Sequence, residues 1–272
     1  MNPCVQVSEK GDDKEVIFTV RNPQGGVDGE ICLLKFHDAS YGFANLKIES
    51  SADYVGTLRL LLQAGIANAK RRQGARIGFR LDESKHQVEQ ETAMRENGFV
   101  FVTRRIEFRA DISSLALDSN SPISWKSLPD LSEESLRYAG AVLDQASTGD
   151  PAKTEVDNAQ EFLRCVLNEN NLTSGPDCVQ IGSMNNVPCA IVVAQVNPCT
   201  GWSRITYIGV VPQFRGQGIS KWVHRHGFAM MKAQGGTLYH GGTDASNIAM
   251  IRLFEQHGCK VYRSMQVWDL KI

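Results

Sequence analysis

A glycine-containing loop is the part of the sequence best suited to chemistry. It follows a β-rich run that ends at Val210, carries glycines at positions 216 and 218, and leads into an amphipathic segment that begins near Ile219. Glycines let the backbone turn tightly with its N–H groups exposed, and a helix N-terminus adds partial positive charge at the same point. A diphosphate can bind there, so the loop predicts a pyrophosphate-bearing ligand. The alternative is an ordinary strand-to-helix turn, because Gly-x-Gly alone is a common pattern. The third glycine of the Rossmann fingerprint and the Walker lysine are both absent.

Two motifs, taken together, resemble a known family. Val210-Val211-Pro212 followed by Gln213-x-x-Gly216-x-Gly218 is similar to the acyl-CoA pyrophosphate loop of the Gcn5-related N-acetyltransferases, the GNAT superfamily. Downstream, Asn247-x-x-Met250-x-x-Leu253-Phe254, ending at Gly258, resembles the second motif of that family. The resemblance covers residues 125–272 as a whole domain. It implies an α/β fold with a mixed sheet and binding of acetyl-CoA as the acyl donor.

The resemblance also implies a set of binding residues. The strand before the loop is expected to splay from its neighbour, so that the backbone of Val210 and Val211 binds the pantetheine arm like an added strand. Loop amides hold the diphosphate, Arg215 either adds charge to a phosphate or is solvated, and Asn247 bonds the pantetheine amide or lies near the leaving sulfur. The implied acyl-CoA-binding residues are Val210, Val211, Gln213, Phe214, Arg215, Gly216, Gln217, Gly218, Ile219, Ser220, Asn247 and Phe254.

Direct acyl transfer is the reaction that the resemblance implies. A deprotonated primary amine attacks the thioester, a backbone N–H near Val210 stabilises the oxyanion, and an acid protonates the CoA thiolate. The family often supplies this acid as a tyrosine in the second motif, and the matching residue here is Phe254, which has no proton to give. Because a thiolate leaves readily without protonation, the change is expected to slow the reaction without abolishing it.

The general base is not specified by the sequence. The strand 203–211 contains no Asp or Glu, which leaves Asp244, His240 and Tyr207 as candidate catalytic residues in the expected cleft. Each has an alternative structural role. Asp244 can be a turn or capping residue, His240 an ordinary strand histidine, and Tyr207 a core or cleft-wall aromatic.

The order of predicted elements supports two related domains. From residue 131 onwards the hydrophobic periodicity predicts two helices, a three-stranded antiparallel meander, and then helix, strand, helix and strand, which is the order ααβββαβαβ. The first half repeats the later part of this order and closes with a strand pair over 99–108. We therefore predict two tandem GNAT-like domains, 1–118 and 125–272, joined by a linker at 119–124.

The first domain is expected to be degenerate. Where the phosphate loop should lie, the sequence reads Ser50-Ser51-Ala52-Asp53-Tyr54-Val55-Gly56, with one acidic residue and one glycine. An anionic diphosphate would be repelled there. Residues 1–118 are thus predicted to pack on the catalytic domain without binding CoA.

Composition excludes several classes of protein. The 272 residues carry 29 Lys and Arg against 30 Asp and Glu, so nucleic-acid binding has no overall electrostatic support. No apolar run is long enough for a membrane helix, no secretion signal is evident, and seven cysteines without a Cys-x-x-Cys pair suggest neither a disulfide scaffold nor a metal site. We expect a cytoplasmic protein that uses no metal.

The leading functional hypothesis is transfer of an acetyl group from acetyl-CoA to a primary amine of a small molecule or peptide. The sequence leaves open a non-catalytic acyl-CoA-binding or interaction module, and transfer of a different acyl group. It identifies neither the acceptor nor the oligomeric state, and a homodimer is among the states left open.

Overall fold

The computed structural model describes residues 4–10, 15–36, 39–49, 52–83, 87–115, 121–149, 158–169 and 171–272. They form two compact units: unit 1 comprises Met1–Arg105 and Arg263–Ile272, and unit 2 comprises Ile106–Tyr262.

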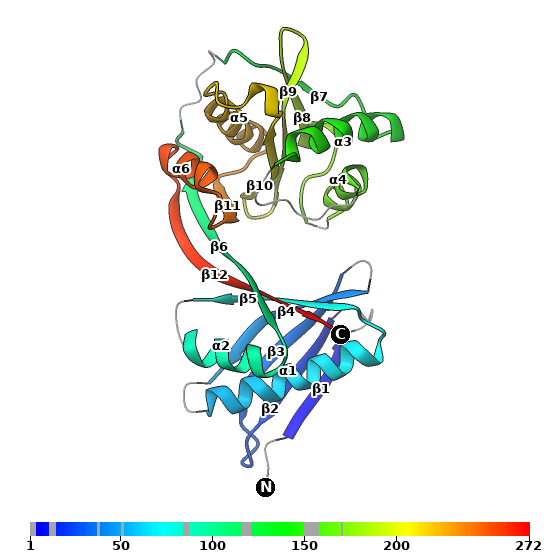
Figure 1. Cartoon of the computed structure of the whole chain (residues 1–272), viewed down its shortest axis with the longest axis vertical. Coiled ribbons are helices and arrows are strands. Elements are labelled where there is room, and N and C mark those ends of the chain that lie inside the picture. The colour runs from blue at the N-terminus through cyan, green and yellow to red at the C-terminus, as the bar shows by residue number, and fades with distance from the viewer. Residues whose placement is uncertain are drawn as a thin grey trace. The chain divides into compact units, whose positions relative to one another are not determined.

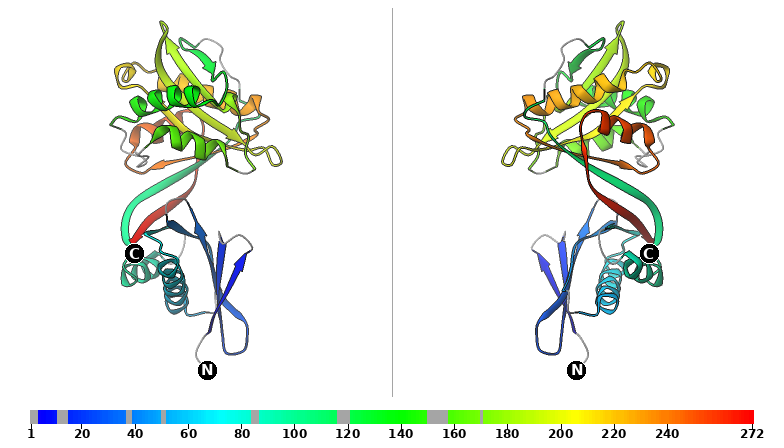
Figure 2. Two further views of the ribbon diagram at one scale, coloured as in Figure 1. Left: turned by 90° about the vertical axis from the view of Figure 1, so that its right-hand side faces the viewer. Right: turned by 90° about the vertical axis from the view of Figure 1, so that its left-hand side faces the viewer.

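Unit 1 is a sheet with helices on one face (Figures 1 and 2). Its strands lie in the order β1 (Cys4–Lys10), β2 (Glu15–Arg21), β3 (Val27–Lys35), β4 (Ser40–Ile48), β5 (Arg76–Asp82), β12 (Lys260–Lys271) and β6 (Val100–Asp111). β4 and β5 pair in parallel, whereas β5 and β12 pair antiparallel. The helices are α1 (Tyr54–Arg71) and α2 (Gln87–Glu96). Alternate residues of β2, such as Val16 and Phe18, are buried beneath α1 together with its Leu58 and Leu61.

Unit 2 has helices on both faces of its sheet (Figure 2). The strand order is β6, β11 (Leu238–Asp244), β10 (Trp202–Val210), β9 (Val187–Val196), β8 (Val179–Met184) and β7 (Ser124–Ser127). The helices are α3 (Glu133–Ser147), α4 (Ala159–Leu167), α5 (Ser220–Ala233) and α6 (Ile248–Gln256), with short 3₁₀ turns η1 (Pro176–Cys178) and η2 (Pro212–Phe214). Two apolar cores result, one shared by α3, α4 and the sheet and the other shared by α5, α6 and the sheet.

The predicted element order is confirmed. Helices α3 and α4 are followed by the antiparallel meander β8–β9–β10 and then by α5, β11, α6 and β12. In unit 1 the series β2, β3, β4, α1, β5, α2 repeats the series β8, β9, β10, α5, β11, α6. The prediction of a strand pair over 99–108 is wrong, because β6 is one continuous strand, Val100–Asp111. No glycine, proline or asparagine interrupts that segment to form a turn.

The compact units differ from the predicted ranges 1–118 and 125–272 in their closing strands. The end of β12 belongs to unit 1, where Met265–Lys271 pair with β5 and Trp268 is fully buried in the core. The end of β6 belongs to unit 2, where Phe108 and Ile112 are buried. Of the predicted linker, residues 119–120 lie outside the described residues. The two units thus exchange their closing strands. The sequence analysis did not predict this exchange, because strand periodicity shows which face of a strand is buried but does not identify the neighbouring strand.

Candidate functional site

Strands β10 and β11 diverge in unit 2, as predicted. They pair in parallel at Trp202 with Leu238, Ser203 with Tyr239 and Arg204 with His240, while β10 runs on to Val210 and β11 to Asp244. We call the gap beyond the Arg204–His240 pair the fork.

The hydrogen-bonding pattern of β10 shows which backbone groups face the fork. The Val211 N–H donates to the carbonyl oxygen of Cys189 at 2.9 Å, so Val211 is turned towards β9. Successive residues of a strand direct their N–H and C=O groups to opposite sides. Gly209 therefore also faces β9, and the backbone groups of Ile208 and Val210 face the fork. Of the two residues expected to bind a pantetheine arm, Val210 directs its N–H towards the fork while its carbonyl oxygen accepts from Arg215, and the amide of Val211 is bonded to Cys189.

A cavity of about 470 Å³ lies at the open end of the fork, beside Ile208, Gly209 and Val210. Its walls come from the ends of α3 and β10, from the start of α5, and from α6 with the turn before it. The lining residues are Ala146, Gly149, Ile208, Gly209, Val210, Arg215, Ser220, Val223, Ser246, Asn247, Ile248, Ala249, Met250 and Leu253. A side chain at Gly209 would collide with neighbouring groups, since its Cβ would lie 2.8 Å from Cβ of Ala146 and 2.9 Å from the Tyr207 hydroxyl oxygen.

The glycine loop lies beside the cavity, which is lined by Arg215 and Ser220 at the two ends of the loop but not by residues 216–219. Gly216 and Gly218 have φ angles of +74° and +72°, a backbone conformation that favours glycine, and a Cβ at either position would project into open space. Helix α5 starts immediately afterwards at Ser220, and no side chain caps it. By contrast, Ser132 caps α3 and Asn247 caps α6. The first amides of α5 therefore remain available to an anion, which fits the diphosphate predicted for this loop.

Arg215 joins the glycine loop to β10 and α3 by hydrogen bonds. Its Nε donates to the carbonyl oxygen of Val210 and its Nη2 to the carbonyl oxygen of Ala146, both at 2.9 Å. The guanidinium thus joins β10 to the end of α3 while still lining the cavity. Phe214 packs against both apolar cores, and Ile219 is buried in the one beside α5.

The exposed residues of the loop make a local contact. Gln217 donates from Nε2 to the carbonyl oxygen of Gln213 at 3.1 Å, and both side chains are exposed.

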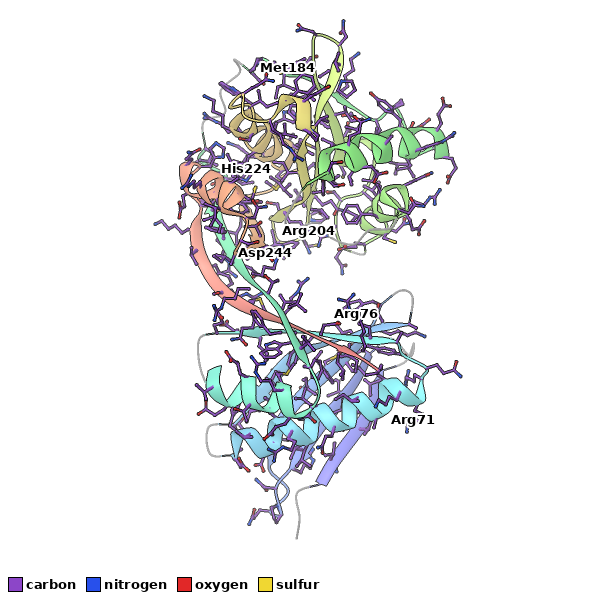
Figure 3. All side chains as sticks on the ribbon, in the orientation of Figure 1. Arg71, Arg76, Met184, Arg204, His224 and Asp244 are labelled. Carbon is purple, nitrogen blue, oxygen red and sulfur yellow. The ribbon has the colours of Figure 1, made fainter. Side chains whose placement is uncertain are left out.

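The turn before α6 contains two predicted site residues. Oδ1 of Asp244 accepts hydrogen bonds from the N–H of Ser246 at 2.8 Å and from its hydroxyl at 2.6 Å (Figure 3 labels Asp244). Oδ1 of Asn247 accepts from the N–H of Met250 at 3.1 Å and caps the helix. Asp244 thus performs the turn role named as its alternative, and it holds the cavity-lining hydroxyl of Ser246.

Three other predicted site residues occupy different surroundings. Tyr207 lies beside Phe162 of α4, with its hydroxyl close to Gly209. His240 lies at the closed end of the fork and is half-buried. Phe254 is 1% exposed and stacks on Phe108 with ring centroids 4.4 Å apart, so it is a core residue of unit 2.

A buried histidine pair joins the two helices that line the cavity. Nδ1 of His224 on α5 lies 2.6 Å from Nδ1 of His257 at the end of α6, and its Nε2 lies 3.4 Å from the Tyr239 hydroxyl (Figure 3 labels His224). His224 has no exposed surface, and burial, followed by the charge of His257, lowers its pKa to about 3. Burial, followed by the positive charge of Arg225, also lowers the pKa of His257. Both rings are therefore neutral at pH 7, and one donates its Nδ1 proton to the other.

Sequence reasoning missed part of the cavity wall. Ile208 could have been found from strand alternation before the loop, because every second residue faces away from β9, as Val210 does. Ala146 and Gly149 could not, since their place beside β10 results from long-range packing of α3. Within the described ranges, no cluster of His, Cys, Asp and Glu is arranged to hold a metal ion, and no helix is long and apolar enough to cross a membrane.

Residues 147–259 match the profile of the Acetyltransferase (GNAT) family. This range contains the fork, the glycine loop and the turn before α6. This part of the chain, residues 147–259, is a GNAT-family domain. The match supports acyl transfer as the general activity of the domain, with acyl-CoA as the donor that the family uses. No curated protein matches the sequence.

Solved structures extend the likeness of fold to almost the whole chain. A GCN5-related N-acetyltransferase from Sphaerobacter thermophilus is 16% identical with a TM-score of 0.70, and the match covers 94% of this chain and 80% of that one. A tandem GNAT protein from the clavulanic acid biosynthesis pathway is 13% identical with a TM-score of 0.63, covering 94% of this chain and 82% of its own. The tandem GNAT fold includes the N-terminal unit.

Proposed function

We propose that unit 2 transfers an acetyl group from acetyl-CoA directly to a primary amine. The observation that carries this proposal is the cavity at the open fork, which is lined by Arg215 beside the glycine loop and by Ser220 at the start of an uncapped helix. These features supply what an acyl-CoA needs: an anion site for the diphosphate, strand backbone for the pantetheine arm, and an apolar wall.

Each part of the donor has a complementary group. The amides of Gly216 and Gly218 and the start of α5 face a diphosphate. The Val210 and Ile208 backbone groups extend along the fork, where a pantetheine arm adds as a strand. The N–H groups on this edge are also the donors that stabilise an oxyanion as the amine attacks the thioester.

Of the three candidate bases, His240 is the one we propose to deprotonate the amine. It lies at the last paired position before the fork, and histidine is the side chain that most often acts as a general base. Asp244 is bonded to Ser246, and Tyr207 packs beside α4. Phe254 cannot protonate the thiolate, so the CoA sulfur leaves as a thiolate and takes its proton from solvent.

Unit 1 is proposed to bind no acyl-CoA. Its equivalent helix, α1, is capped by Asp53, whose Oδ1 accepts the N–H of Gly56 at 3.1 Å. The carboxylate occupies the position where a phosphate would bind and carries the same sign of charge. In addition, Nε2 of Gln90 on α2 donates to the Tyr54 hydroxyl at 2.8 Å, which ties α2 to the start of α1.

The test is acetyl-CoA binding measured by thermal unfolding and by calorimetry, beside a Gly216→Glu variant. A ligand of the native state raises its melting temperature in proportion to saturation, so the wild type should shift with one site per chain and the variant should not. Gly235→Glu is the matched control: this glycine also has positive φ, +86°, and open space at its Cβ, but it lies beyond the far end of α5. The control should bind normally.

Two results would contradict the proposal. No thermal shift in the wild type would remove acetyl-CoA as the ligand, and longer acyl-CoAs would then be tested in the same assay. Two equivalent sites per chain would contradict the assignment of unit 1.

The alternative is a non-catalytic acyl-CoA-binding module, favoured by the core position of Phe254. Detection of free CoA thiol over a panel of amines separates the two functions, because a binding module leaves its bound acetyl-CoA intact and therefore releases no thiol. His240→Gln should bind acetyl-CoA like the wild type but lower kcat by about 10²-fold or more.

A further inference from the structure

The face of the unit 2 sheet opposite α5 and α6 carries a row of aromatic and cationic side chains. Tyr239 and Phe108 point into the core beside α5, so the next residues, His240 and Arg109, point to the opposite face. Helix α3 packs on β8, β9 and β10 of that face, whereas the row lies across β10, β11, β6 and β12.

The row is held by ring contacts. The His240 ring lies 5.6 Å from that of Trp202 and 6.0 Å from that of Tyr262. The Arg109 guanidinium lies 3.1 Å from the centroid of the Tyr262 ring. Tyr262 is 45% exposed, so the row is accessible from solvent.

Arg109 differs from Arg204, another arginine near this face. The Arg204 guanidinium pairs with Glu169 at 2.7 Å and bonds the Thr206 hydroxyl and the Gln195 amide oxygen. Nε of Arg109, in contrast, is buried and has no hydrogen-bond partner among the described residues. Asp111, two positions along the same strand, is bonded to the hydroxyl and N–H of Ser113. A buried guanidinium N–H without an acceptor is costly, and an oxyanion is the group that satisfies it best.

The row lies next to the fork, where acyl transfer is proposed to take place. The donor cavity is lined by α5, α6 and the end of α3, and an acceptor bound at the row would reach the fork from the sheet face opposite α5 and α6. His240 belongs both to the row and to the closed end of the fork.

We propose that Arg109 binds an oxyanion of the acceptor, so that the preferred substrates are amines carrying a carboxylate or a phosphate group, with Trp202 and Tyr262 flanking the rest of the molecule. This inference rests on the proposed function of unit 2 for the identity of the ligand as an acceptor. Arg109 is on this view a specificity residue and takes no part in proton transfer.

Matched acceptor pairs test the proposal. Phenylalanine is compared with phenethylamine for the carboxylate, and phosphoethanolamine with ethanolamine for the phosphate. At least one anionic member should have a kcat/KM about 10-fold or more above its neutral partner, mainly through KM. Arg109→Gln should abolish that preference and leave acetyl-CoA binding unchanged, and the Arg252→Gln control, on the exposed side of α6, should retain it.

A second readout needs no turnover. Saturation-transfer NMR with phenylacetate and phenyl phosphate reports direct binding, and the signal should be lost in both Arg109→Gln and Tyr262→Leu. Equal signals in the wild type and Arg109→Gln, or no binding to the wild type, would overturn the proposal. If the probes bind as expected while no amine is acetylated, the oxyanion site stands and the proposed transferase function fails.

Discussion

The buried His224–His257 pair gives the protein a calculable sensitivity to acid. His224 has a pKa of about 3 in the folded protein against an ordinary value of 6.5. Below pH 6.5 the unfolded chain binds a proton that the folded protein does not, so stability is complete above that pH and falls as the pH decreases towards 3. Each unit of pKa corresponds to about 1.4 kcal/mol, so His224 alone should remove about 2.5 kcal/mol of unfolding free energy between pH 7 and pH 4.5.

The perturbation is His224→Asn, whose amide retains a hydrogen-bonding group near His257 but does not titrate. Urea unfolding is followed by tryptophan fluorescence in a Trp268→Phe background, so that the remaining tryptophans, at positions 125, 202 and 222, all report on unit 2. The variant should be less stable at pH 7, because the ring packing with Phe228 is lost. Between pH 7 and pH 4.5, the free energy of unfolding should decrease in both proteins, but by about 2.5 kcal/mol less in the His224→Asn variant than in the Trp268→Phe background.

Parallel pH curves for the background and the variant would refute this reasoning. His226→Gln is the comparison within the same helix, because burial also lowers the pKa of His226, to about 4, while its ring stacks on Trp125 away from the pair. The effects of His224→Asn and His226→Gln on the pH dependence of stability should add, because the His224–His257 pair and the His226–Trp125 pair share no residue.

Three further predictions concern packing, the cavity and the cysteines. Trp268→Ala should destabilise unit 1 by about 3–5 kcal/mol, because Trp268 is fully buried in that core, while acetyl-CoA still binds to unit 2; calorimetry measures both. Asn247→Ala should cost about 1 kcal/mol through loss of the α6 cap and also weaken acetyl-CoA binding, whereas Asn158→Ala, at the cap of α4, should lower stability alone. Iodoacetamide at pH 8 should label the exposed Cys199 in the native protein but spare Cys259, whose pKa is raised by burial to about 12; labelling of both at equal rates, seen by mass spectrometry, would contradict this.

Local sequence determined much of the candidate site, and long-range packing determined the rest. The positive φ angles at Gly216 and Gly218 follow from residue type, and the tight turn there was predicted. The cap at Asn247 also follows from residue type, although the sequence analysis assigned Asn247 only to the pantetheine arm or the leaving sulfur. Arg215 was predicted as a phosphate ligand or a solvated side chain, yet its bonds to Val210 and Ala146 depend on where α3 ends in space. The burial of Phe254 against Phe108 depends on a strand from the first half of the sequence entering unit 2. No periodicity in the second half can reveal that neighbour.

The exchange of closing strands also affects the order in which the protein can fold during synthesis. The strand that completes unit 1 is made after every residue of unit 2, so the edge of β5 stays unpaired while unit 2 is being translated. Unit 2, which takes its closing strand from residues made earlier, can finish first. The N-terminal half is therefore the part of the nascent chain that remains exposed longest, and an unpaired strand edge is a site at which chains aggregate. A chain truncated after Tyr262 would contain all of unit 2 but only part of unit 1.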